Sequence, residues 1–126
     1  MKTVEIGRLG EDIAVKFLKN NNYSIIDRNV HVSHNEIDII AKDKNYIIFV
    51  EVKTRSTDES MELRFGTPAA AVDHRKQKRT VNAARAYLTN TRFADLQPRL
   101  DVIEVFIHKK THKLIKINHI ENAFGA

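Results

Sequence analysis

Two runs of β-type apolar residues, separated by a short polar segment, constrain the fold of this chain more than any other feature. The runs cover residues 36–41 and 46–54, and Lys42-Asp43-Lys44-Asn45 lies between them. Runs of this kind around a tight polar turn predict a β-hairpin. If the four polar residues form the turn, Ile40 faces Ile47 across the hairpin.

Acidic and basic side chains interrupt the hairpin where a half-buried strand would carry Val or Ile. In this register Asp38 faces Phe49, so Glu51 is the diagonal neighbour of Asp38 on the same face. Lys53 follows Glu51 by two residues, and the strand period of two places it on that face as well. Two carboxylates and a lysine on one sheet face are typical of a metal-assisted phosphodiesterase.

The apolar neighbours of these charges predict a central, largely buried hairpin. One face is predicted to carry Ile37, Ile39, Ile48, Val50 and Val52, and the other Ile40, Ile47 and Phe49. Charges in such a place need a partner or a metal ion. An ion pair between Lys53 and either Asp38 or Glu51 would also satisfy them, so the sequence leaves a purely structural alternative open.

The rest of the chain predicts an α/β domain with the element order αβββαββ. Apolar residues recur at helical spacing from residue 5 to 20 and again from 69 to 89. Strands are predicted at 23–32, 99–107 and 114–120, in addition to the hairpin. The segment 55–68 is predicted to be a mobile loop over the substrate. A mixed sheet flanked by helices follows from this order.

Two further acidic residues lie near the predicted site. Glu11 borders the apolar stripe of the first helix and has Val15, not a lysine, at i+4. It could lean towards the metal, or be a first-turn glutamate stabilised by the helix dipole. Glu36 is predicted to point to the face opposite Asp38 and to steady the turn.

Composition narrows the function. The 126 residues suit one domain, 1–126, and 42% are apolar. The absence of cysteine excludes disulfides and thiolate metal sites. No signal peptide or membrane-spanning run is apparent either, and together these features predict a cytoplasmic protein. The net charge of +5 favours an anionic partner, and nucleic acid fits best.

The second helix carries a cationic stripe suited to phosphate. Its members are Arg75, Lys78, Arg79, Asn82 and Arg85. Lys76 lies on the first turns of this helix, where it could reach the site. Arg55, two residues after Lys53, is also expected to contact nucleic acid. A solvated face is the alternative reading of such a stripe. His108 and His112 have zinc-like spacing, but they lie in a predicted turn with no third ligand nearby in the sequence, so no zinc site is expected.

Taken together, these residues resemble the PD-(D/E)XK, or restriction endonuclease-like, superfamily, and within it the YraN-type family of small bacterial predicted endonucleases. The resemblance covers nearly the whole chain. It is carried by Gly7-Arg8-Leu9-Gly10-Glu11, Arg28-Asn29, Glu36-Ile37-Asp38-Ile39-Ile40-Ala41, Phe49-Val50-Glu51-Val52-Lys53-Thr54-Arg55, Phe65-Gly66, Lys76-Gln77 and Arg99-Leu100-Asp101-Val102. Asn35 stands where a glycine usually precedes the Glu-Ile-Asp run.

The resemblance implies a restriction endonuclease-like αβββαβ core, here with an additional C-terminal strand, related to archaeal Holliday-junction resolvases. It implies Asp38 and Glu51 as ligands of Mg²⁺ or Mn²⁺, Lys53 as the catalytic lysine and Glu11 as the completing carboxylate. The Val52 carbonyl is a further expected donor. The expected activity is endonucleolytic cleavage of DNA, and paired incisions would need a homodimer. The alternative is an inactive nuclease-fold module that only binds nucleic acid.

Overall fold

The computed structural model describes the chain except for residues 1, 33, 59–73, 90–92, 94 and 124–126. Two helices and five strands follow one another in the order αβββαββ, as predicted. Their bounds are α1 Thr3–Asn20, β1 Ser24–Val32, β2 Asn35–Lys42, β3 Tyr46–Thr57, α2 His74–Leu88, β4 Gln97–His108 and β5 Leu114–Ile120.

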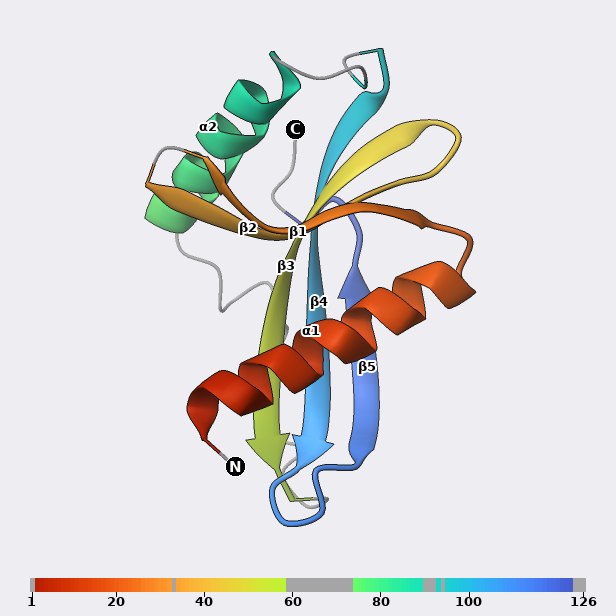
Figure 1. The fold of residues 1–126 in the computed structure, drawn as a ribbon, viewed down its shortest axis with the longest axis vertical. Helices are drawn as coiled ribbons and strands as arrows, with labels where there is room; N and C mark the ends of the chain where they lie inside the picture. Colours follow the sequence, from red (N-terminus) through yellow and green to blue (C-terminus); the bar gives the residue numbers. More distant parts are fainter. Residues whose placement is uncertain (1, 33, 59–73, 90–92, 94, 124–126) are drawn as a thin grey trace.

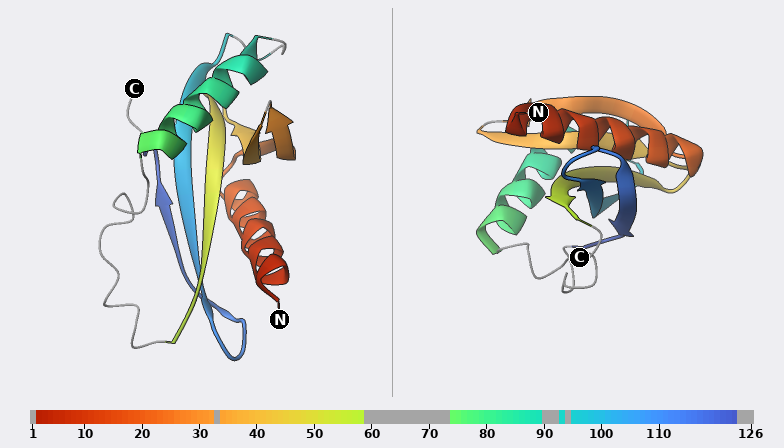
Figure 2. Two further views of the ribbon diagram at one scale, coloured as in Figure 1. Left: turned by 90° about the vertical axis from the view of Figure 1, so that its left-hand side faces the viewer. Right: turned by 90° about the horizontal axis from the view of Figure 1, so that it is seen from below.

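The strands form one mixed sheet in the order β1-β2-β3-β4-β5 (Figure 1). β3 and β4 pair in parallel, and the other neighbours pair antiparallel. Parallel strands need a crossover, which the segment containing α2 supplies. The helices lie on opposite sides of the sheet, as the left view of Figure 2 shows. The predicted α/β class, a mixed sheet flanked by helices with an additional C-terminal strand, is confirmed and is consistent with a restriction endonuclease-like fold.

Each helix covers a separate apolar cluster. α1 buries Ala14 and Leu18 against Ile39, Val50 and other residues of the sheet. The second cluster joins α2 to the opposite face of the hairpin. It contains Ile37, Ile40, Ile47, Phe49, Ala83 and Ala84. A sheet covered on both faces explains why β3 and β4 read as nearly continuous apolar runs.

The hairpin register differs from the predicted one by two residues. Ile40 pairs with Phe49, and Lys42 pairs with Ile47. The reason is the turn chemistry: Asp43 Oδ1 accepts hydrogen bonds from the backbone N–H groups of Asn45 and Tyr46, at 2.9 and 2.8 Å. The turn therefore begins at Asp43, one residue later than predicted. Because a shift of two preserves the alternation of side chains, it does not move any residue to the other face.

Two further predictions need correction. Ile37 was predicted to share a face of the hairpin with Ile39, but it packs in the cluster under α2. The pairing of β2 with β3 ends at Ile39↔Val50, and beyond that point the twist of the strand turns Ile37 towards α2. The predicted loop began at Arg55, but β3 continues to Thr57, since its parallel pairing with β4 extends that far. Most of that loop, and residues 69–73 of the predicted second helix, lie outside the described residues.

Candidate active site

The candidate site lies where β2 separates from β3. The ladder between these strands ends at the pair Ile39↔Val50, and continuing its register places Asp38 across from Glu51. Asp38 Oδ2 accepts a hydrogen bond from the Val52 N–H at 2.8 Å, so the carboxylate replaces the next backbone partner in the ladder. This bond fixes Asp38 against β3 instead of leaving it to rotate in solvent.

Asp38 and Glu51 border the same small cavity. Its volume is about 60 Å³, and Glu36, Phe49 and Thr80 are also among its lining residues. Thr80 comes from α2, so the cavity is closed on one side by the helix that carries the cationic stripe. The structure thus brings together the two carboxylates that the sequence placed on one face.

Lys53 lies beside Glu51. Lys53 Nζ is 3.9 Å from Glu51 Oε1, and the two side chains are 21% and 10% exposed. This distance exceeds that of a close charge-assisted hydrogen bond, which is about 2.7–2.9 Å. The ion pair expected under the structural alternative therefore exists, but in a loose form that leaves the ammonium partly accessible.

Glu11 approaches the site from α1. The helix begins at Thr3, so Glu11 lies two turns inside it and the first-turn alternative does not apply. Burial and then the Asp38 carboxylate raise the pKa of Glu11 above its ordinary value of 4.5. Arg28 acts against this shift, with Nη2 3.8 Å from Glu11 Oε1. After burial, the charge of Asp38 is the next cause of the raised pKa, so Glu11 lies close enough to Asp38 to interact with it electrostatically.

Asn29 and Glu36 lie beside Glu11 and Asp38, although no role in binding was predicted for either from the sequence. With its amide turned to donate, Asn29 Nδ2 lies 3.1 Å from Glu11 Oε1 and 3.0 Å from Glu36 Oε1. Asn29 has φ of 52°, a left-handed conformation that asparagine tolerates. Glu36 was predicted to face away, yet it lines the Asp38 cavity. The prediction was wrong because residues 36 and 38 are two apart, and the strand period of two places such residues on the same face.

The donor set fits a hard divalent cation. Among the residues that the structure describes, no three His, Cys, Asp or Glu side chains are grouped to hold a metal ion. The available set is therefore a pair of carboxylates, Asp38 and Glu51, with the Val52 carbonyl nearby in sequence. Mg²⁺ is commonly bound by one or two carboxylates, with water and substrate phosphate completing its octahedron. The negative charge of Asp38, which after burial is the next cause of the raised Glu11 pKa, would favour such a cation.

The predicted phosphate contacts separate into two groups. Arg75, Lys78, Arg79 and Arg85 are exposed along α2, as a phosphate-binding face requires. Arg55 lies apart from them: its Nε is 2.9 Å from Glu104 Oε2, and the Glu104 side chain is 3% exposed. The Lys76 side chain lies outside the described residues. His108 Nδ1 accepts from the Lys110 N–H at 3.1 Å, which supports a turn-forming role for this histidine.

A second charged cluster joins β4 to β5. Asp101 is buried and accepts two hydrogen bonds from Arg99, at 2.9 and 2.8 Å, and its Oδ2 lies 2.7 Å from His119 Nε2. Burial alone would raise the pKa of Asp101, but the bonds from His119 and Arg99 outweigh it and hold the pKa below 3.8. The sequence singled out Arg99 and Asp101 only through the family resemblance and did not predict this pairing.

Comparison with known proteins identifies close relatives. The model of "Uncharacterised protein family UPF0102" matches residues 10–105. A UPF0102 protein of Caldanaerobacter subterraneus subsp. tengcongensis is 43% identical over 119 residues, covering 94% of this chain and 93% of the relative. One of Acetivibrio thermocellus is 45% identical over 121 residues, covering 94% and 89%.

Solved structures are more distant. An fdxN element excision controlling factor protein from Anabaena variabilis is 14% identical, with a TM-score of 0.42 over 87% of this chain and 98% of that one. This similarity is too low to support an inference about function. None of the helices in the described part of the chain is long and apolar enough to cross a membrane.

Proposed function

This chain belongs to the UPF0102 family, and we propose that it is a Mg²⁺- or Mn²⁺-dependent endonuclease that hydrolyses DNA phosphodiester bonds. Membership confirms the YraN-type family expected from the sequence. The assignment to the PD-(D/E)XK superfamily and the relation to Holliday-junction resolvases are part of the proposal, as is a preference for branched or non-B DNA. So are a cytoplasmic location and a homodimer for paired incisions.

The observation that carries the proposal is the shared cavity of Asp38 and Glu51 with Lys53 beside it. Asp38, Glu51 and the Val52 carbonyl would hold the cation, which when bound would polarise the scissile phosphate and acidify a water molecule. Lys53 would orient that water and stabilise the charge that develops on the phosphate. Its loose contact with Glu51 leaves it able to exchange this partner for the substrate.

The surrounding residues have supporting parts. Glu11, whose pKa is raised, would hold an ordered water at the edge of the site, and Arg28 limits the local excess of negative charge. Arg75, Lys78, Arg79 and Arg85 would contact backbone phosphates, which gives affinity that falls with salt and carries no base specificity.

The test is cleavage of linear, flap and four-way DNA with Mg²⁺ or Mn²⁺. Wild type should cut at least one substrate, and Asp38→Asn and Lys53→Ala should each reduce the rate by at least about 100-fold, the scale expected when one electrostatic group at a reacting centre is removed. Lys110→Ala is the control for Lys53→Ala, because it also removes one lysine charge but lies in the distant turn before β5. Equal cutting by all four proteins would show that the site lies elsewhere.

A binding module without catalysis is the second candidate, and the Glu51–Lys53 ion pair favours it. In that case Lys53 neutralises Glu51 permanently, and no cation binds. Calorimetric titration with Mn²⁺ separates the two candidates, because only the endonuclease requires saturable binding that Asp38→Asn abolishes.

A further inference from the structure

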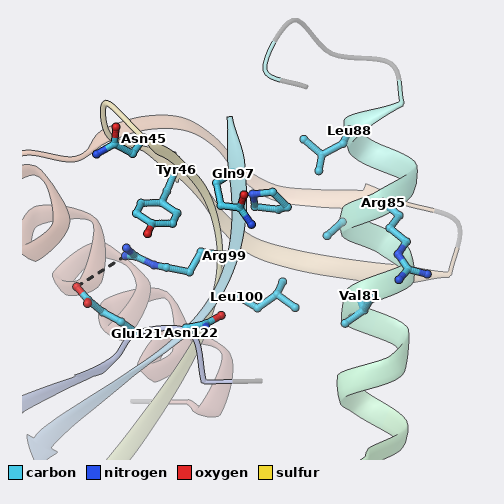
Figure 3. A pocket seen from close by; sticks show the side chains of 12 residues that line it. Asn45, Tyr46, Val81, Arg85, Leu88, Gln97, Arg99, Leu100, Glu121 and Asn122 are labelled. Carbon is cyan, nitrogen blue, oxygen red and sulfur yellow. Dashed lines mark ion pairs between the residues drawn. The ribbon is translucent and has the colours of Figure 1, made fainter. Parts of the chain in front are cut away.

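A groove beside α2 is distinct from the acidic cavity. It has a volume of about 870 Å³ and lies between α2 and the beginning of β4 (Figure 3). Val81 and Leu88 of α2 and Leu100 of β4 supply apolar surface on its two sides. The groove arises because β4 begins at Gln97, whereas its pairing with β5 begins only at Val102. The start of β4 therefore projects past β5.

Hydrogen-bonding groups surround this apolar surface. The amide side chains of Asn45, Gln97 and Asn122 line the groove, and Arg85 projects from α2 at its border (Figure 3). A side-chain amide both donates and accepts, as the edge of a nucleobase does. Apolar walls with a few polar groups that fix orientation are typical of small-molecule binding sites, and a single base is a ligand of that size.

One wall is held rigid by the Arg99 cluster. Arg99 is 9% exposed, is bonded to Asp101 through Nε and Nη2, and lies 4.9 Å from the centre of the Tyr46 ring. Glu121, the acidic residue among the lining set, lies 3.8 Å from Arg99 and is thus partly neutralised. Because these contacts fix the Tyr46–Arg99 wall, a ligand would meet a preorganised surface.

The charge around the groove favours an anionic ligand. α2, His74–Leu88, contains no Asp or Glu, and Arg85 belongs to its exposed cationic stripe. The same helix borders both sites, since Thr80 lines the acidic cavity and Val81 lines the groove. Thr80 and Val81 are adjacent in the sequence, so one extended polyanion that lies along α2 can contact both sites.

We propose that this groove receives an unpaired base of single-stranded nucleic acid while Arg85 contacts the adjoining phosphate. The ligand class rests on the proposed function, which the groove deepens by selecting strands with unpaired bases near the acidic cavity. Recognition is expected to depend on the base ring and its edge, as for other proteins that bind single strands.

Binding of a short labelled oligothymidylate, measured by fluorescence anisotropy in EDTA, tests this proposal. An oligomer with the same sugar–phosphate chain but abasic sites should bind about tenfold more weakly, because one stacked base contributes about 1–3 kcal/mol. Gln97→Ala should reduce that difference. Equal binding of the intact and abasic oligomers would overturn the proposal.

Arg85→Ala and Arg79→Ala form a matched pair. Both remove one exposed arginine from α2, but only Arg85 lines the groove. Both variants lose one phosphate contact, and this loss weakens binding equally in the two. In addition to it, Arg85→Ala should weaken binding about fivefold, and Arg79→Ala less than about twofold. Equal effects, or displacement of the oligomer by polyglutamate at the same charge concentration, would show a nonspecific anion surface and overturn the proposal.

The binding assay is independent of hydrolysis. Base-dependent binding without any cleavage would refute the proposed endonuclease activity and leave the groove assignment intact. Cleavage of DNA without base-dependent binding would refute the groove assignment and leave the endonuclease proposal intact.

Discussion

Replacing Gly10 with alanine tests whether the close crossing of α1 over β3 positions Glu11 in the site. A Cβ atom at Gly10 would overlap Thr54 Oγ1 and lie 2.8 Å from both Cβ and Cγ2 of Thr54. Rotation of the Thr54 side chain moves Oγ1 and Cγ2 but cannot move Cβ, which is bonded directly to the backbone of β3. The helix must therefore move away from the sheet.

Two effects of opposite sign set the magnitude. Alanine stabilises a helix interior by about 0.5–1 kcal/mol relative to glycine. Overpacking of a buried contact costs about 1–3 kcal/mol. Since Gly10 is buried, we expect Gly10→Ala to lower the free energy of unfolding by about 1–2 kcal/mol and to displace Glu11 from Asp38.

Gly7→Ala is the matched control, because it lies in the same helix and a Cβ there would have nothing within 4 Å. It should raise the free energy of unfolding by about 0.5–1 kcal/mol, from helix propensity alone. Urea denaturation followed by circular dichroism measures both changes.

A double-mutant cycle with Thr54→Ala completes the test. That substitution removes Oγ1 and Cγ2, so it should recover part of the loss in Gly10→Ala and give a favourable coupling energy. If Gly10→Ala is as stabilising as Gly7→Ala, or if the coupling is zero, the close approach of α1 to β3 is not as described.

Four other measurements follow from the structure. Asp101→Asn should lower the free energy of unfolding at pH 7 by about 3–5 kcal/mol, because it removes the carboxylate bonded to the buried Arg99 guanidinium and leaves it with the more distant Glu121 carboxylate, at 3.8 Å. The pKa of Asp101 is held below its ordinary value, so ionised Asp101 stabilises the fold above about pH 3.8, and this contribution is lost as the pH falls further. The free energy of unfolding of Asp101→Asn should therefore fall less in that pH range than that of the wild type. Mn²⁺ at 100 times its Kd should stabilise the wild type by about 2.7 kcal/mol in thermal unfolding and Asp38→Asn by nothing measurable. Phe49→Ala should cost about 3–5 kcal/mol in urea denaturation, because the ring is 1% exposed and packs edge-on against Tyr87 at 5.8 Å.

The alternation of the hairpin explains how much of the site was predictable. The register was wrong by two residues, yet Asp38 and Glu51 still border one cavity, because side chains repeat with the same period. The turn was misplaced since the side-chain bonds of Asp43 to the backbone, which select the turn residues, are not apparent from composition.

Contacts between distant segments were not predictable in the same way. Asn29 joins Glu11 of α1 to Glu36 of β2, and Arg55 turns to Glu104 of the neighbouring strand instead of to substrate. Each depends on which strands become neighbours and on how far the sheet twists, and neither is encoded in a local pattern.

Local periodicity and turn composition, read from the sequence alone, determined the order of the helices and strands and the face of the hairpin that carries Asp38, Glu51 and Lys53. Only the tertiary structure decided how far each charge is buried, which partner it meets, and where a groove opens beside α2. The physical reason is range: backbone periodicity acts over neighbouring residues, whereas burial and ion pairing depend on elements that meet only after the chain has folded.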